Sequence, residues 1–383
     1  MDLLRFDFQP RTRLIFGAGV ASRVGELAAE LGASKILLVT DAGIVAAGHA
    51  ANVQASLQAA GLSITLFDQV RENPTTRCVD NCVAVAKSAG IDALIGLGGG
   101  SAMDTAKGCN FILTNGGRMQ DYWGVGKATK PMLPFVAIPT TAGTGSEMQC
   151  AALIADEQTH QKMACLDPKC AARVAILDPL LTLSQPPRVT ACTGIDAIAH
   201  AVETAVTTKR NPVSQMFSRE AFRLCVRALP RVLEHPDDWE ARADMQLGAA
   251  FAGAAIENSM LGAAHAAANP LTAHFGITHG HAVGLMLPHV VRFNAAEELN
   301  AVTYAQLGVQ AGIGAAVDEL AKRLGQLLEL AGLPGSLACC NVRPGRIPAL
   351  ANEAARQWTA NFNPRPVAAA DFVHLYTKAL NAP

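Results

Sequence analysis

The stretch DALIGLGGGSAMDTAKGCNFIL, residues 92–113, joins an apolar run to a helical run through a row of glycines. Short unbroken apolar runs are typical of strands buried on both faces of a parallel sheet. Because glycine amides and a helix N-terminus can hold a pyrophosphate, GLGGGSAMD (96–104) indicates a nucleotide site. The turn lacks the G-x-G-x-x-G spacing of the Rossmann fingerprint, and packing alone would also account for its glycines.

The same alternation continues on both sides of this stretch. KILLVTD (35–41), SITLFDQV (63–70) and MLPFVAIPTTAGTGSE (132–147) are predicted to form strands, the last running into a Gly/Thr loop. Helical segments separate them, which predicts βαβ units and a parallel sheet covered on both faces. After Pro186-Pro187 the β-rich runs stop and the chain is Ala-rich and helical. We therefore predict an α/β nucleotide-binding domain over 1–186 and an all-helical metal-binding domain over 187–383.

Composition excludes several classes of protein. Half of the 383 residues are hydrophobic and 16% are charged, as in a compact globular protein. The formal net charge of −1, without blocks of like charge, argues against a nucleic-acid or membrane partner. Segment 245–268 contains Glu257 and Asn258, which favours one or two packed core helices over a membrane span. Ten cysteines without a secretion signal favour reduced thiols and a cytoplasmic protein.

Two further features of the first half are suited to a nucleotide. The loop TTAGTGS (140–146) follows a predicted strand, and open α/β sheets bind ligands at the carboxyl ends of their strands. Asp41 ends the strand at 35–41, where a carboxylate can accept hydrogen bonds from an adenosine ribose. A helix N-cap would explain Asp41 equally well.

The segment GIDAIAHAVE (194–203) carries an acid and a histidine four residues apart, Asp196 and His200. Four residues are about one helical turn, so both side chains project from one face. The positions between them are small or apolar, which predicts a buried helix. Burying an ionised aspartate is costly unless its charge is compensated. From these residues alone, a hydrogen bond to the histidine and a metal ion are both possible.

Five of the ten histidines lie in one segment, residues 259–289. They are His265, His274, His279, His281 and His289. Any one of them could be a satisfied core histidine, but imidazoles combined with a carboxylate suit Zn²⁺ or Fe²⁺. The sequence has no H-E-x-x-H motif, so a metal here would act as a Lewis acid rather than in a zincin site.

Four motifs together resemble one family. GLGGGSAMDTAKG (96–108), IPTTAGTGSE (138–147), GIDAIAHAVE (194–203) and AAHAAANPLTAHFGITHGHAVGLMLPHV (263–290), in this order and spacing, are similar to the iron-dependent (group III) alcohol dehydrogenases. The resemblance covers nearly the whole chain, including NPT (73–75) and NPR (363–365). It implies a dehydroquinate synthase-like fold, with an α/β dinucleotide-binding domain followed by an all-helical domain.

The resemblance also implies the cofactors and their ligands. Carried over by position, the metal ligands would be Asp196, His200, His265 and His279, so that the metal compensates the charge of Asp196. We expect Fe²⁺, with Zn²⁺ as the alternative. The second cofactor would be NAD, lying along Asp41, Asn73, Gly98, Gly99, Gly100, Ser101, Asp104, Thr140, Thr141, Thr144 and Lys162.

The sequence departs from this family at one position. Many relatives carry a second histidine four residues after the third ligand, where it assists proton transfer. Here the position is Asn269, which cannot titrate. His274 and His281 could take over a proton or substrate role. Alternatively, both are helix-cap or surface histidines.

The resemblance implies reversible oxidation of a small alcohol to an aldehyde or ketone, by a homodimer or larger oligomer. A polyol (glycerol-type) dehydrogenase and a metal-independent reductase are alternatives, although the complete ligand set argues against the reductase. A lyase similar to dehydroquinate synthase would need clustered bases to bind a phosphorylated acid. The helical half shows only scattered ones, such as Lys209, Arg210, Arg219 and Arg223.

Overall fold

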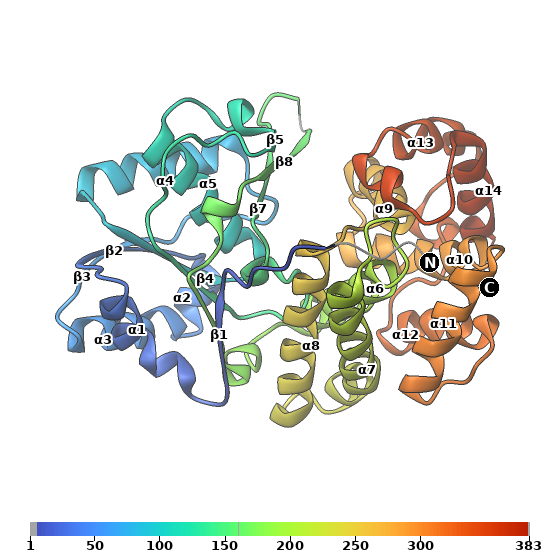
Figure 1. Ribbon diagram of the computed structural model, residues 1–383, viewed down its shortest axis with the longest axis horizontal. Helices are drawn as coiled ribbons and strands as arrows, with labels where there is room; N and C mark the ends of the chain where they lie inside the picture. Colours follow the sequence, from blue (N-terminus) through green and yellow to red (C-terminus); the bar gives the residue numbers. More distant parts are fainter. Residues whose placement is uncertain (1–5, 160, 382–383) are drawn as a thin grey trace. The chain divides into compact units, whose positions relative to one another are not determined.

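The computed structural model describes residues 6–159 and 161–381. Contacts divide the chain into two compact units. An α/β unit comprises 9–141 and 145–185, and a helical unit comprises 6–8, 142–144 and 186–381. Figure 1 shows the α/β unit in blue to green and most of the helical unit in yellow to red.

The α/β unit is built on a six-stranded sheet in which every neighbouring pair is parallel. Its strands, in spatial order, are β1 (Arg13–Phe16), β9 (Val174–Leu177), β6 (Phe135–Pro139), β4 (Ala93–Gly98), β2 (Lys35–Val39) and β3 (Ser63–Phe67). The predicted parallel sheet is confirmed. The runs at 35–41, 63–70, 92–100 and 132–147 contain β2, β3, β4 and β6.

Helices lie on both faces of this sheet (Figure 1). They are α1 (Val24–Glu30), α2 (Ala42–Ala46), α3 (His49–Ala59), α4 (Thr76–Ala89) and α5 (Gly100–Asn115). Successive residues of a strand point to opposite faces. Leu37 of β2 therefore joins the core beneath α4 and α5, whereas Leu38 joins the core beneath α1 and α3. Burial on both sides explains why the central strands β4 and β6 contain no polar side chain.

A second, three-stranded sheet was not predicted from the sequence. It consists of β5 (Gly124–Val125), β8 (Lys162–Leu166) and β7 (Ala151–Ala155), in that order. β7 and β8 are antiparallel, and β5 pairs with β8 in parallel. β5 has only two residues, and β7 and β8 are short and contain alanine, which has low β-propensity, so their pattern gives little signal.

The helical unit contains only helices, turns and loops among its described residues. Its α-helices are α6 (Pro187–Thr204), α7 (Pro212–Glu234), α8 (Trp239–Glu257), α9 (Ala263–Phe275), α10 (His279–Asn294), α11 (Glu298–Ala311), α12 (Val317–Leu330), α13 (Ile347–Ala354) and α14 (Ala369–Leu380). The segment 245–268, predicted to form one or two core helices, lies in α8 and the first half of α9. Pro187 and Pro212 occupy first helical positions, where proline's fixed φ suits the helix and no amide is lost.

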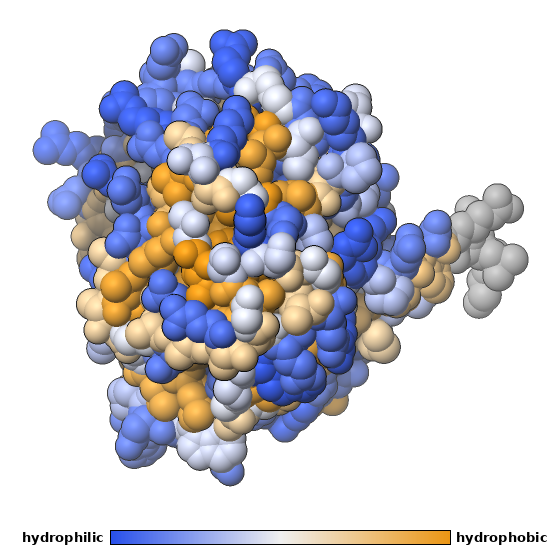
Figure 2. All heavy atoms as spheres, turned by 90° about the vertical axis from the view of Figure 1, so that its left-hand side faces the viewer, coloured by the Kyte–Doolittle hydropathy of each residue, from blue (hydrophilic) through white to orange (hydrophobic). Residues whose placement is uncertain are grey.

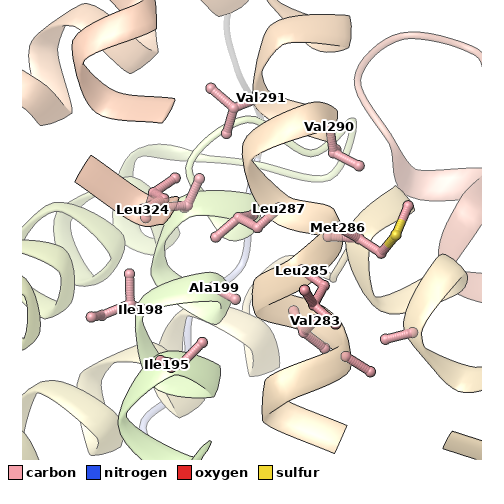
Figure 3. Close-up of a cluster of buried hydrophobic side chains, with 14 of the residues drawn as sticks. Ile195, Ile198, Ala199, Val283, Leu285, Met286, Leu287, Val290, Val291 and Leu324 are labelled. Atoms are coloured by element: carbon pink, nitrogen blue, oxygen red, sulfur yellow. The ribbon is translucent and has the colours of Figure 1, made fainter. Parts of the chain in front are cut away.

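Helices α6 and α10 pack closely against each other. Figure 3 shows Ile198 and Ala199 of α6 beside the apolar side chains of α10, with Leu324 of α12 next to them. Two glycines of α10 make this approach possible. A Cβ atom at Gly280 would overlap the carbonyl oxygen of Cys192, and one at Gly284 would lie 2.6 Å from Ile195. The short separation brings the first residue of α10, His279, next to α6.

The surface has both polar and apolar regions. Figure 2 shows hydrophilic residues around the rim of one face and hydrophobic residues near its middle. At the edge of the large sheet, β3 has three half-buried residues, Ile64, Thr65 and Leu66. Among the described residues, no helix combines the length and hydrophobicity needed to cross a membrane.

Candidate functional site

Three helices of the helical unit bring the predicted metal ligands together. Asp196 and His200 lie one turn apart on α6, His265 is the third residue of α9, and His279 is the first residue of α10. The Asp196 Oδ1 atom lies 3.4 Å from His265 Nε2, 3.6 Å from His200 Nε2 and 4.0 Å from His279 Nε2. The donor atoms therefore converge on one small volume, as in a metal site.

The structure distinguishes three of these residues from the fourth. One donor atom from each of Asp196, His265 and His279 lies within 4.8 Å of the other two. The His200 ring stacks on that of His265, with centroids 4.8 Å apart and planes inclined by 18°. A cation bound by Asp196, His265 and His279 would thus have His200 beside it.

Burial and hydrogen bonding test whether a cation fits. Asp196, His200 and His265 are 3–6% exposed. Although Asp196 Oδ1 and His265 Nε2 are close, neither atom has an aligned hydrogen-bond partner among the described residues. Buried polar atoms in native proteins are nearly always hydrogen-bonded, and a divalent cation would satisfy both. One carboxylate with imidazoles is a donor set that suits Fe²⁺ or Zn²⁺.

The charges of the cluster are strongly coupled. Burial would raise the pKa of Asp196, but the charge of His200 and a contact with His265 lower it well below its usual range. Burial would lower the pKa of His265, but the carboxylates of Glu203 and Asp196 raise it to about 9. Asp196 is therefore an anion that attracts cations into a buried site.

The sequence analysis missed Glu203, the last residue of GIDAIAHAVE. Its side chain is 3% exposed. His265 Nδ1 donates to Glu203 Oε2 at 2.5 Å, and the backbone amide of Ala264 donates to Oε1 at 2.7 Å. Glu203 lies seven residues after Asp196, which is about two helical turns. The helical spacing could therefore have placed it on the same face.

The predicted nucleotide turn joins β4 to α5 in the α/β unit. Gly98 has φ +145°, and a Cβ atom there would lie 3.0 Å from that of Ala102, so the position favours glycine. The N-cap of α5 is Gly99, which provides no side-chain cap. The amide of Thr140, at the end of β6, donates to Gly98 O at 3.0 Å. Gly98, Gly99, Gly100 and Ser101 thus lie beside Thr140 at the carboxyl ends of adjacent strands.

Asp41 fits both interpretations offered for it. Its Oδ1 atom accepts from the amides of Gly43 at 2.9 Å and Ile44 at 3.1 Å, so it caps α2. Its Oδ2 atom lies 3.5 Å from where a Cβ atom of Gly98 would be. One carboxylate oxygen stabilises the helix, and the other faces the glycine turn.

The remaining predicted nucleotide residues have different surroundings. Asp104 is buried and accepts a hydrogen bond from Ser146 Oγ at 2.8 Å. Lys162 is the exposed first residue of β8, and Asn73 is exposed with φ +52°. Thr141 belongs to the α/β unit, whereas 142–144, including Thr144, belong to the helical unit. The Thr loop is thus divided between two units.

The polar residues that follow His265 have their own partners. The side-chain amide of Asn269 donates to Gln357 Oε1 at 3.0 Å. His274 pairs with Glu353 at 2.8 Å, with both side chains about one-third exposed. His281 is 3% exposed, and its Nε2 atom donates to the carbonyl of Pro334 at 2.8 Å. The description of His281 as a helix-cap or surface residue is wrong, because α10 turns it into the core.

A carboxylate–imidazole cluster in one unit and a glycine turn that opens a helix in the other are features suited to a metal-dependent, nucleotide-linked oxidoreductase. Comparison with known proteins agrees. Residues 10–179 match the family described as "Iron-containing alcohol dehydrogenase", and 190–380 match "Fe-containing alcohol dehydrogenase family, C-terminal". The chain belongs to the iron-containing alcohol dehydrogenase family.

Individual relatives span nearly the full length of the chain. It is 34% identical to the NAD-dependent methanol dehydrogenase of Bacillus methanolicus, over 96% of this chain and 97% of that protein. It is 33% identical to the lactaldehyde reductase of Escherichia coli K12, over 95% of this chain and 97% of that protein. A solved structure of a 1,3-propanediol oxidoreductase superposes with a TM-score of 0.94 at 31% identity, covering 98% of this chain and all of that one.

Membership of this family settles the class of reaction. The protein is an enzyme that carries out NAD-linked oxidoreduction of alcohols. Its cofactors are NAD and a divalent metal, which in this family is typically iron. The predicted family, fold class and cofactors are confirmed.

Proposed function

We propose that the protein reversibly oxidises a small alcohol to an aldehyde or ketone, with its metal held by Asp196, His200, His265 and His279. The supporting observation is the convergence of buried donors from α6 and α9 with the partly exposed His279 of α10, and the lack of an aligned partner for Asp196 Oδ1 and His265 Nε2 among the described residues. A bound divalent metal supplies Lewis acidity, which favours loss of the proton from a neighbouring alcohol.

Each unit has its own part in the proposal. Residues 1–186 would bind NAD, with the pyrophosphate on the amides of 98–101 and the ribose on Asp41. Residues 187–383 would bind the metal and the alcohol, and the nicotinamide would accept the hydride. We further propose a cytoplasmic enzyme that forms a homodimer or larger oligomer.

The direct test is a spectrophotometric assay. The metal-loaded protein is incubated with NAD and a panel of monoalcohols, vicinal diols and longer polyols, and the absorbance of reduced cofactor is followed. We expect reduction with at least one small alcohol, lost after chelation and restored by Fe²⁺ or Zn²⁺. Activity that survives complete removal of metal would contradict the proposed Lewis-acid role.

Cofactor choice provides a prediction about Asp41. Its carboxylate would repel the 2′-phosphate of NADP, so we expect a higher kcat/KM with NAD. Charge repulsion at 4 Å costs about 1–4 kcal/mol near a protein surface. Asp41→Asn removes this charge but keeps a side chain that can cap α2. The ratio of kcat/KM for NAD to that for NADP should therefore fall at least about fivefold in Asp41→Asn.

Asp41→Gly serves as the comparison, because it removes both the charge and the cap. Its cofactor preference should match that of Asp41→Asn, and its thermal stability should be lower. Equal kcat/KM values for the two cofactors in the unaltered protein would mean that Asp41 is only a helix cap.

The proton released by the alcohol needs a route, because Asn269 cannot titrate. We propose that it leaves through the ribose hydroxyls of NAD or ordered water, rather than through His274. Removing a true acid–base group costs about a hundred- to ten-thousandfold in rate. Since His274 pairs with Glu353, His274→Ala should lower kcat only severalfold and keep the shape of its pH profile. Loss of an ionisation from the pH profile of kcat would refute this route.

A further inference from the structure

We infer that Glu203 is a positioning residue that holds the metal ligand His265 in the tautomer and orientation needed for binding. This inference rests on the metal site proposed above. Glu203 lies on α6 and His265 on α9, so their contact joins two of the helices that contribute ligands. The carboxylate contacts the Nδ1 atom of the imidazole, whereas the Nε2 atom lies near Asp196.

The first step concerns the imidazole proton. A carboxylate oxygen accepts, so the 2.5 Å contact with Glu203 Oε2 places the proton of His265 on Nδ1. Nε2, the atom 3.4 Å from Asp196 Oδ1, is then the nitrogen that binds a metal, with release of its own proton. Hydrogen bonds of this kind fix the orientation of a metal-bound histidine and increase its basicity.

The second step concerns the backbone that carries His265. The N-cap of α9 is Gly262, which has no side chain to satisfy the first amides of the helix. Glu203 Oε1 accepts from Ala264 N at 2.7 Å, and Asn363 Oδ1 accepts from Ala263 N at 3.3 Å. A Cβ atom at Gly262 would lie 3.1 Å from both of these oxygens. The glycine therefore lets two distant side chains reach the first turn of α9.

The third step concerns the support of Asn363, the first residue of the NPR motif. Its Nδ2 atom donates to Asn294 Oδ1 at 2.8 Å, and Asn294 Nδ2 donates back to Asn363 Oδ1 at 3.1 Å. Asn294 also donates to the Tyr304 hydroxyl at 3.2 Å. All three residues are 4% exposed or less. A buried polar network thus holds the first turn of α9 beside Glu203.

Replacing Glu203 with glutamine tests the inference. Glutamine has one acceptor oxygen, so it cannot reproduce the separate contacts of Oε1 with Ala264 N and of Oε2 with His265 Nδ1. Losing the outer partner of a metal-bound histidine typically weakens metal affinity about 10- to 100-fold. We expect Glu203→Gln to raise the Kd for Zn²⁺ by that factor, measured on the full-length protein by chelator competition, well below its unfolding temperature.

Glu353→Gln is the matched control. Glu353 also pairs with a histidine of α9, but with His274 rather than with a proposed ligand. Its substitution should leave the Kd for Zn²⁺ unchanged. If Glu203→Gln does not fold, Glu203→Asp takes its place in the test. This variant keeps both carboxylate oxygens but moves them back by one methylene, and it should weaken Zn²⁺ binding about tenfold.

A double substitution separates positioning from a purely structural role. If Glu203 acts through His265, Glu203→Gln should change the residual Zn²⁺ affinity of His265→Ala by less than about twofold. If Glu203 only stabilised α9, its substitution would lower the unfolding temperature and leave the Kd for Zn²⁺ unchanged. Wild-type Zn²⁺ affinity in the folded Glu203 variants would overturn the inference about Glu203 but not the proposed ligand set. Wild-type affinity in His265→Ala would instead overturn the proposed ligand set.

Discussion

Replacing His265 with alanine is expected to remove most of the bound metal and nearly all alcohol oxidation, while leaving NAD binding intact. His265 Nε2 faces Asp196 at 3.4 Å in a buried cluster, so alanine removes a donor that no neighbour can replace. Polarisation by a metal lowers an activation barrier by several kcal/mol, and about 1.4 kcal/mol corresponds to a tenfold change in rate. We expect kcat/KM to fall on the order of a thousandfold or more.

Elemental analysis, alcohol kinetics and calorimetric titration with NAD measure the three parts of this prediction. His374→Ala is the control, because His374 is an exposed residue of α14 in the same unit. It should keep full metal content and activity. A fully metallated and active His265→Ala would rule out His265 as a ligand.

Replacing Gly280 with alanine is expected to cause a large loss of stability. The new Cβ atom would overlap the carbonyl oxygen of Cys192 and approach the Cβ of Asp196 to 3.1 Å, so α10 must move away from α6. Overpacking of this kind costs about 1–3 kcal/mol of unfolding free energy, and sometimes more. Because Gly280 follows His279, the displacement should also weaken metal binding.

Chemical denaturation with and without metal measures both effects. The control is Gly325→Ala in α12, where a Cβ atom would meet nothing within 4 Å. That substitution should stabilise the protein by about 0.5–1 kcal/mol, because alanine loses less conformational entropy in a helix. Equal stability of the two variants would show that the α6–α10 contact tolerates a side chain at position 280.

The fold was largely predictable, because its central strands leave a strong local pattern. β2 contains four consecutive buried apolar residues, 36–39, β4 is a run of six residues without a polar side chain, and each strand is followed by a helical segment. β7 and β8 are different. Their sequences are AALIA and KMACL, and both have small side chains and are only partly buried. Such short sequences are consistent with several secondary structures. Their pairing depends on contacts that a local pattern does not contain.

For the site, helical spacing placed Asp196 and His200 together but could not choose among the later histidines. His281 is two residues after His279, about 200° around the helix, so it faces the core instead. His274 is nine residues after His265, about 13 Å further along α9. Only the crossing of α6, α9 and α10 decides which imidazoles meet, and that crossing was implied by family resemblance rather than by spacing.

The network that supports His265 also has a consequence for how the enzyme is made. Glu203 bonds to a residue 61 positions later in the chain, and Asn363 bonds to one 100 positions earlier. A growing chain folds from its N-terminus as it is synthesised. All four proposed ligands are synthesised before Asn363. At that stage Glu203 is the only one of these two side chains that can hold the first turn of α9. We therefore expect the metal site to reach its mature geometry only after residue 363 has been translated.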